Sequence, residues 1–136
     1  PVAEVLKLLG SEHVMVVHSE DGLDEISIAE PTQVAELKQG RIDSYRIEPE
    51  SFGIPSGPLA QLRVSDAAES LARIESVLDD QPGAARDIVR MNAGAAIYVS
   101  GVAHSLADGV ERATEALRSG AARDKLRALV ELSRRL

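Results

Sequence analysis

The chain has 136 residues, of which 44% are hydrophobic and 27% charged, and its formal net charge is −7. This length and composition indicate one soluble globular domain with a real core. The acidic balance and the scarcity of aromatic residues argue against a nucleic-acid binder, which needs a basic face or a base-stacking platform.

Cysteine is absent, which excludes disulfides, thiolate zinc sites and cysteine nucleophiles and is compatible with a reducing cytoplasm. No apolar run approaches the roughly 18 residues of a membrane span. We therefore expect neither a membrane-spanning segment nor a signal peptide.

The beginning of the chain predicts a helix, a strand and an acidic loop. The apolar positions of residues 2–9 predict a helix that Gly10 caps. The continuous apolar run Val14–Val17 predicts a strand that is buried on both faces. After the acidic loop, the alternation at residues 26–28 predicts a short half-buried strand.

Two further strands are expected at residues 33–38 and 41–47, joined by a hairpin turn at Gln39-Gly40. The segment 48–58 contains three prolines and two glycines, which predicts an irregular loop.

From Asp66 the pattern becomes helical. Asp66 and Glu69 have the spacing of a capping box, and Pro82-Gly83 ends the first helix. A second helix is expected at residues 84–100, and its small-residue segment 93–96 would let another element approach closely. A third runs from Ser105 to Gly120 and a fourth over residues 122–136. Two apolar stripes are expected to face neighbours: Ala67, Leu71, Ile74 and Leu78, and then Leu126, Leu129, Val130 and Ser133.

The order of strand, hairpin and then helices predicts an α/β fold. It fits either a complete small α+β domain or the last part of a larger α/β domain. A single buried strand is a thin core for four or five helices, which favours the larger domain.

The most informative segment is the acidic loop after the first strand, which carries Glu20, Asp21, Asp24 and Glu25 around Gly22. Carboxylates at a strand end suit Mg²⁺, which takes one or two of them and fills its other positions with water and substrate phosphates. The alternative is a solvated turn, the commoner meaning of such clusters. The spacing does not match an EF-hand.

Three other features are assigned structural roles. His18 could be a base or a metal ligand, but alone at a strand end it is expected to be a hydrogen-bonded structural histidine. His13 and His104 have no nearby partner in the sequence and are also expected to be structural. Asn92, between apolar positions, is interpreted as a buried amide that ties helix ends together. Helix-surface ion pairs account for the close spacing of three residues, Arg86, Asp87 and Arg90.

Four segments in order resemble the anthranilate phosphoribosyltransferases. They are VVHSEDGLDEIS at 16–27, YRIEPESFG at 45–53 with its P-x-x-F-G motif, RDIVRMNAGAA at 86–96, and Gly109 with SGAA at 119–122. Ser19 is a departure, because many members carry glycine there. The resemblance implies a fold of the nucleoside phosphorylase/phosphoribosyltransferase type. It also implies that residues 1–136 are the C-terminal part of the large α/β domain, without the family's N-terminal helical domain.

The resemblance implies Mg²⁺-dependent transfer of a phosphoribosyl group from phosphoribosyl pyrophosphate to anthranilate, in tryptophan biosynthesis. The family's magnesium-binding pair maps onto Asp24 and Glu25, while no catalytic or substrate-binding residue is assigned. We expect the intact enzyme to be a cytoplasmic homodimer without nucleic-acid or membrane partners, and this chain alone to be inactive. The alternatives are an enzyme of the pyrimidine nucleoside phosphorylase class and a non-enzymatic acidic metal-binding or interaction module.

Overall fold

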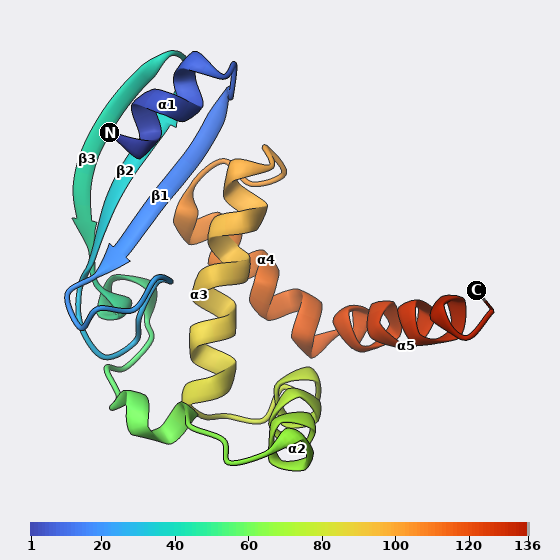
Figure 1. Cartoon of the computed structure of the whole chain (residues 1–136). Helices are drawn as coiled ribbons and strands as arrows, with labels where there is room; N and C mark the ends of the chain where they lie inside the picture. Colours follow the sequence, from blue (N-terminus) through green and yellow to red (C-terminus); the bar gives the residue numbers. More distant parts are fainter. Residues whose placement is uncertain (136) are drawn as a thin grey trace.

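The computed structural model describes residues 1–135, and it places a three-stranded antiparallel sheet beside a group of helices (Figure 1). The strands are β1 (His13–Ser19), β2 (Thr32–Lys38) and β3 (Arg41–Ile47), in that spatial order. The α-helices are α1 (Val2–Leu8), α2 (Ala67–Leu78), α3 (Ala84–Val99), α4 (Leu106–Arg118) and α5 (Ala121–Ser133), with 3₁₀ turns η1 (Pro49–Phe52) and η2 (Leu59–Leu62). The α/β class and the order of strand, hairpin and helices are thus confirmed.

The β2–β3 hairpin has the predicted turn. Gln39 and Gly40 both have positive φ, 50° and 75°, which the two central residues of a type I′ turn require. The turn sets the register, in which Lys38 is opposite Arg41 and Thr32 is opposite Ile47.

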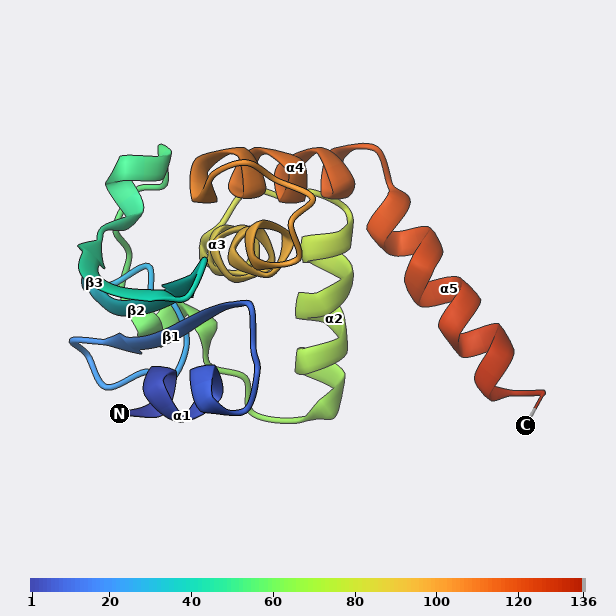
Figure 2. The ribbon, with the colours of Figure 1, turned by 90° about the horizontal axis from the view of Figure 1, so that it is seen from above.

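Helix α3 lies at the centre of the molecule, with α4 and α2 alongside it (Figure 2). The core joins the sheet, the loops, α3 and α4, and its buried members are Ile26, Ile28, Val34, Ile47, Ile54, Met91 and Val110. The loop that follows β1 therefore belongs to the core through Ile26 and Ile28. Within residues 1–135, no helix combines the length and hydropathy needed to cross a membrane.

Two glycines allow α3 and α4 to pack closely. A Cβ on Gly94 would lie 2.7 Å from the backbone of Val110, and a Cβ on Gly109 would collide with the carbonyl oxygen of Gly94. The close approach predicted for residues 93–96 is confirmed, and its partner is α4.

The prediction that Val14–Val17 is buried on both faces is wrong. All four residues are only half-buried, because β1 pairs with β2 along one edge and its other edge has no partner strand among residues 1–135. An apolar run identifies a strand, but the burial of that strand depends on both of its neighbours.

The predicted strand at residues 26–28 is also wrong. Ile26, Ser27 and Ile28 are buried to within 1% exposure, but they form an irregular segment that pairs with no strand. Side chains, and not a neighbouring strand, form hydrogen bonds with the backbone of this segment. For example, the Ser27 amide donates to Oγ1 of Thr32 at 3.2 Å.

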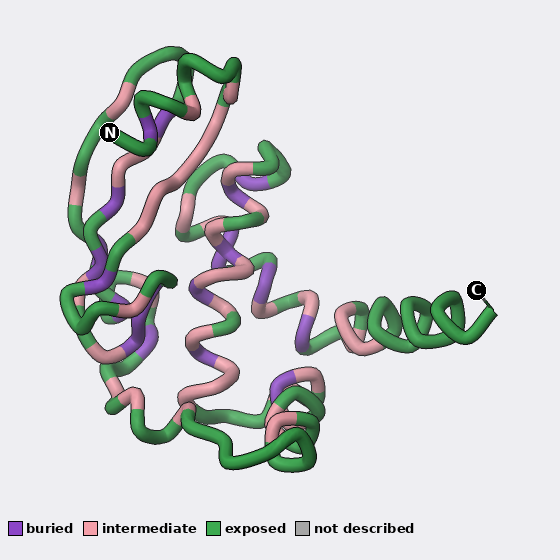
Figure 3. Tube along the Cα trace, viewed as in Figure 1, coloured by how far each residue is buried: buried purple, intermediate pink, exposed green. Residues whose placement is uncertain are grey.

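Helices α2 and α5 begin where predicted but leave much of their apolar surface uncovered (Figure 3). In α2, Leu71 and Ile74 are about half exposed, while Val77 is buried. Helix α5 extends away from the body, and Leu129 is 61% exposed. The described residues therefore provide no neighbour for most of either predicted stripe.

Candidate functional site: the acidic loop

The four carboxylates of the loop between β1 and β2 fall into two pairs with different surroundings. Glu20 is tied to the sheet, since its Oε1 accepts hydrogen bonds at 3.0 Å from both Gln33 and Arg46. Ser19 is buried and donates to the Pro31 carbonyl at 3.3 Å. These contacts bring the two ends of the loop together.

Asp21 holds the loop internally. Its carboxylate accepts hydrogen bonds from the Ser27 hydroxyl at 2.6 Å and the Leu23 amide at 3.0 Å. Burial raises the pKa of Asp21, but these hydrogen bonds lower it more, so that its pKa lies below the ordinary value. Asp21 is therefore a loop-shaping carboxylate at neutral pH.

Asp24 and Glu25 are different. Both are exposed, and within residues 1–135 neither side chain takes part in a hydrogen bond or ion pair. They line a groove of about 480 Å³ together with residues of α2 and α3, among them Ile74, Val77 and Ile88. Two adjacent carboxylates, with no protein partner, thus border an apolar groove.

The backbone just after this pair is fixed to α3. Asn92 accepts a hydrogen bond from the Ile26 amide at 3.0 Å and donates one to the Ile26 carbonyl at 2.9 Å. A third bond, to the Ile88 carbonyl at 3.0 Å, holds the amide on its own helix. Asn92 is thus a tie, as predicted, but it is half-buried, and it joins the middle of α3 to the loop after β1 rather than two helix ends.

The carboxylates of the loop fit a hard divalent cation that takes most of its ligands from water and substrate, not from the protein. Within the described residues no group of three or more histidine or carboxylate side chains is arranged to hold a metal. Mg²⁺ commonly takes only one or two protein carboxylates and completes its octahedron with water and substrate phosphates. Asp24 and Glu25, being adjacent and without competing partners, match that requirement.

The expectation of a hydrogen-bonded His18 is wrong. The residue is exposed at the end of β1, and its ring makes no hydrogen bond within residues 1–135. His13 has the structural role expected of it: its Nε2 lies 2.8 Å from Glu36, and its ring packs edge-on against Tyr98.

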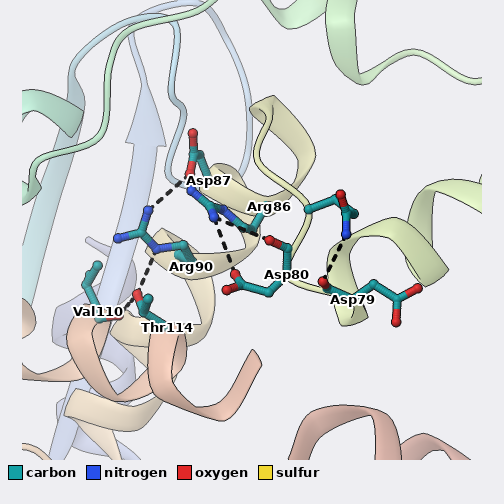
Figure 4. Close-up of polar contacts among 8 residues, drawn as sticks. Asp79, Asp80, Arg86, Asp87, Arg90, Val110 and Thr114 are labelled. Carbon is teal, nitrogen blue, oxygen red and sulfur yellow. Dashed lines mark hydrogen bonds and ion pairs between the residues drawn. The ribbon is translucent and has the colours of Figure 1, made fainter. Parts of the chain in front are cut away.

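The ion pairs expected among Arg86, Asp87 and Arg90 are present, but the prediction that they lie on the helix surface is wrong. Asp87 is only 8% exposed, and Figure 4 shows both arginines directed toward it. Arg86 also reaches Asp80 at 3.4 Å, and Nε of Arg90 donates to Thr114 of α4 at 2.7 Å. The cluster therefore joins the α2–α3 connection, α3 and α4.

A second polar cluster, centred on Glu36 of β2, was not anticipated. Glu36 accepts hydrogen bonds from His13, Tyr45 and Tyr98, at 2.7 to 2.8 Å. Burial raises its pKa, but the three bonds lower it more, and its pKa lies below the ordinary value. Glu36 sits in a strand of alternating pattern, which gives no sign that residues from β1, β3 and α3 converge on it.

Comparison with known proteins agrees with this architecture. The sequence profile described as "Glycosyl transferase family, a/b domain" matches residues 1–123. The chain belongs to this family.

Similar relatives share one name. The anthranilate phosphoribosyltransferase of Thioalkalivibrio sulfidiphilus is 59% identical over 133 residues, which cover 98% of this chain and 39% of that protein. The one from a Marinomonas species is 57% identical over 136 residues. The chain thus spans about two fifths of the length of these relatives.

Solved structures give the same answer for the fold. The crystal structure of anthranilate phosphoribosyltransferase from Thermus thermophilus superimposes with a TM-score of 0.88 at 35% identity, over 98% of this chain and 39% of that one. The Saccharomyces cerevisiae enzyme in complex with PRPP and Mg superimposes with a TM-score of 0.83 at 23% identity, over 99% of this chain and 39% of that one.

Proposed function

We propose that the protein containing this chain transfers a phosphoribosyl group from phosphoribosyl pyrophosphate to anthranilate, giving N-(5′-phosphoribosyl)anthranilate and pyrophosphate in tryptophan biosynthesis. The observation that carries the proposal is the 59% identity to an anthranilate phosphoribosyltransferase over nearly the whole of this chain. The exposed acidic pair supports it, because a reaction that releases pyrophosphate benefits from a bound cation.

Asp24 and Glu25 are the proposed Mg²⁺ ligands. The bound ion would supply electrostatic stabilisation of charge on the leaving pyrophosphate. The yeast relative has been solved with PRPP and Mg. Glu20 and Asp21 are engaged within the protein and are proposed to shape the loop.

We further propose that residues 1–136 are the C-terminal part of the α/β domain, in agreement with the order of the segments that resemble the family. The phosphate-cradling Gly-Thr-Gly-Gly-Asp loop and the Lys-His-Gly-Asn segment of that family would be supplied by the rest of the protein. On this proposal the intact enzyme is a cytoplasmic homodimer, and the 136-residue chain alone has no transferase activity. Detectable phosphoribosyl transfer by the chain alone would contradict that part of the proposal.

The assignment is tested by the double variant Asp24→Asn, Glu25→Gln in the full-length protein. We expect turnover to fall by at least about a hundredfold, because metal polarisation of a reacting group is worth several kcal/mol. The melting temperature should change little, since both side chains are exposed and, within residues 1–135, make no hydrogen bond or ion pair.

Glu30→Gln is the matched control, because Glu30 is an exposed carboxylate of the same loop. It should keep wild-type turnover and magnesium dependence. Unchanged magnesium dependence in the double variant would reject the metal assignment. Phosphorolysis of a pyrimidine nucleoside without phosphoribosyl transfer would instead identify the nucleoside phosphorylase alternative.

A further inference from the structure

The backbone of the acidic pair is held at both of its ends. On the N-terminal side, Leu23 is fixed by two hydrogen bonds of about 3.0 Å, one from its amide to Asp21 and one from the Ser19 amide to its carbonyl. On the C-terminal side, both polar groups of the Ile26 backbone bond to Asn92. Only residues 24 and 25 lie between the two anchors.

The two anchors differ in what they bind to. The Leu23 anchor joins the pair to Asp21 of the loop and to Ser19, the last residue of β1. Asn92 lies in the middle of α3, the central helix, and its side chain is half-buried. The Asn92 clamp is therefore the contact that sets the pair relative to α3, which forms one side of the groove beside the pair.

The clamp needs an amide. One oxygen must accept from the Ile26 amide while the nitrogen donates to two carbonyls, of Ile26 and Ile88. Both hydrogens of the Asn92 amide group are thereby used. Only one orientation of the side chain therefore makes all three hydrogen bonds. A carboxylate of the same shape would place an anionic oxygen against two carbonyl oxygens.

Burial of Ile26 does not replace the clamp. The Ile26 side chain is 1% exposed, so its packing in the core fixes how far this residue lies from the surface. An apolar contact is not directional, however, and it does not fix rotation of the peptide that carries Glu25. Hydrogen bonds to both the amide and the carbonyl of the next residue do fix that rotation.

We propose that Asn92 is a positioning residue for the Asp24–Glu25 pair, which holds the pair in the orientation that binds Mg²⁺. This inference rests on the proposed function, because it assumes that the pair is a metal site. Side chains that orient metal ligands influence affinity strongly, and their loss typically weakens metal binding by 10- to 100-fold.

The test is Asn92→Ala in the full-length protein, with Thr114→Val as the matched control. Thr114 of α4 likewise links two elements through its side chain, which accepts a hydrogen bond from Arg90 of α3 and donates one to the Val110 carbonyl of its own helix, and neither partner belongs to the acidic loop. We expect Asn92→Ala to raise the Mg²⁺ concentration for half-maximal turnover by about tenfold, with partial recovery at saturating Mg²⁺. Thr114→Val should lower the melting temperature without changing the Mg²⁺ requirement.

A second measurement does not depend on activity. Amide exchange of a peptide spanning residues 20–28 should speed up in Asn92→Ala and not in Thr114→Val, because the Ile26 amide loses its acceptor. Unchanged exchange in this peptide, or a lowered melting temperature with an unchanged Mg²⁺ requirement, would overturn the positioning role.

These outcomes are separable from failure of the proposed function. A wild-type protein without phosphoribosyl transfer, or one whose magnesium dependence survives the Asp24→Asn, Glu25→Gln change, would refute the metal site and the positioning role together. A magnesium-dependent wild type with an unaffected Asn92→Ala variant would refute the positioning role alone.

Discussion

At the scale of single residues, Glu36 is the polar group on which most elements converge. It joins all three strands and α3 through His13, Tyr45 and Tyr98, and its side chain is 12% exposed. Such a carboxylate stabilises the fold because three donors would otherwise lose their partner in a poorly hydrated place.

Glu36→Gln should therefore lower the free energy of unfolding by about 2 kcal/mol, since hydrogen bonds to a charged group are worth more than neutral ones. Urea unfolding at pH 7 measures the change. Asp43→Asn is the control, because Asp43 makes only an exposed pair with Arg41 and should change stability by less than about 0.5 kcal/mol. Equal effects of the two variants would contradict the role given to Glu36.

The same residue makes stability depend on pH. The pKa of Glu36 is lower in the folded protein than its ordinary value of 4.5, so the folded state binds the proton less tightly than the unfolded state does. The stabilisation is therefore complete above that value and is lost as the pH falls through the lower folded pKa. The difference in stability between wild type and Glu36→Gln should narrow on going from pH 7 to pH 3. A difference that stays constant over that range would exclude this linkage.

The sequence anticipated some residue roles better than others. The tie made by Asn92 follows from an amide placed among apolar helix positions. The buried setting of Asp87 does not follow from its own helix, because the two arginines that pair with it are also held by Asp80 and Thr114, which come from other elements. His18 was misjudged for the same reason, since a hydrogen-bond partner is a property of the tertiary structure.

At the scale of elements, the local signals were reliable. Asp66 and Ser105 both cap helices as expected, by accepting from the amides of Glu69 and Asp108 at 2.8 and 3.1 Å. Both caps and the Gln39-Gly40 turn involve residues no more than three positions apart. Residues 26–28 have the alternation of a strand, but strand formation needs a neighbouring strand, and the partner of Ile26 is a side chain 66 positions away.

The crossing of α3 and α4 gives a prediction at this scale. Gly94→Ala should lower the free energy of unfolding by about 1 to 3 kcal/mol, because its new Cβ would meet the Val110 backbone, which cannot move aside like a flexible side chain. In an exposed helix the same change would stabilise by up to about 1 kcal/mol.

Thermal unfolding measures this effect, with Gly57→Ala as the control. A Cβ on Gly57 would have no neighbour closer than 4.0 Å, so the control should be close to neutral. A neutral or stabilising Gly94→Ala would mean that the two helices are not in backbone contact in solution.

At the scale of the whole molecule, apolar side chains of several helices remain uncovered. Within residues 1–135, exposed apolar side chains lie on α1, on the Leu71–Ile74 face of α2 and on the outer part of α5, and β1 has a free edge and is only half-buried. The sequence identified these segments as contact-forming by their periodicity, but periodicity does not say what the partner is. The burial of β1 was overestimated for that reason.

Helix α5 allows this point to be tested. It has 13 residues, a length at which an isolated helix is only marginally stable in water. Arg123 ties its first turn to Asp79 at 2.5 Å, whereas Leu129 and Leu132, further along, are mostly exposed. In a dilute solution of the 136-residue chain, we therefore expect the backbone amides of residues 126–133 to exchange much faster than those of α3. Hydrogen exchange with mass spectrometry measures the two rates. Equal protection of α5 and α3 would contradict this expectation. Protection that rises with protein concentration would show that the apolar face of α5 is covered by a second copy in solution.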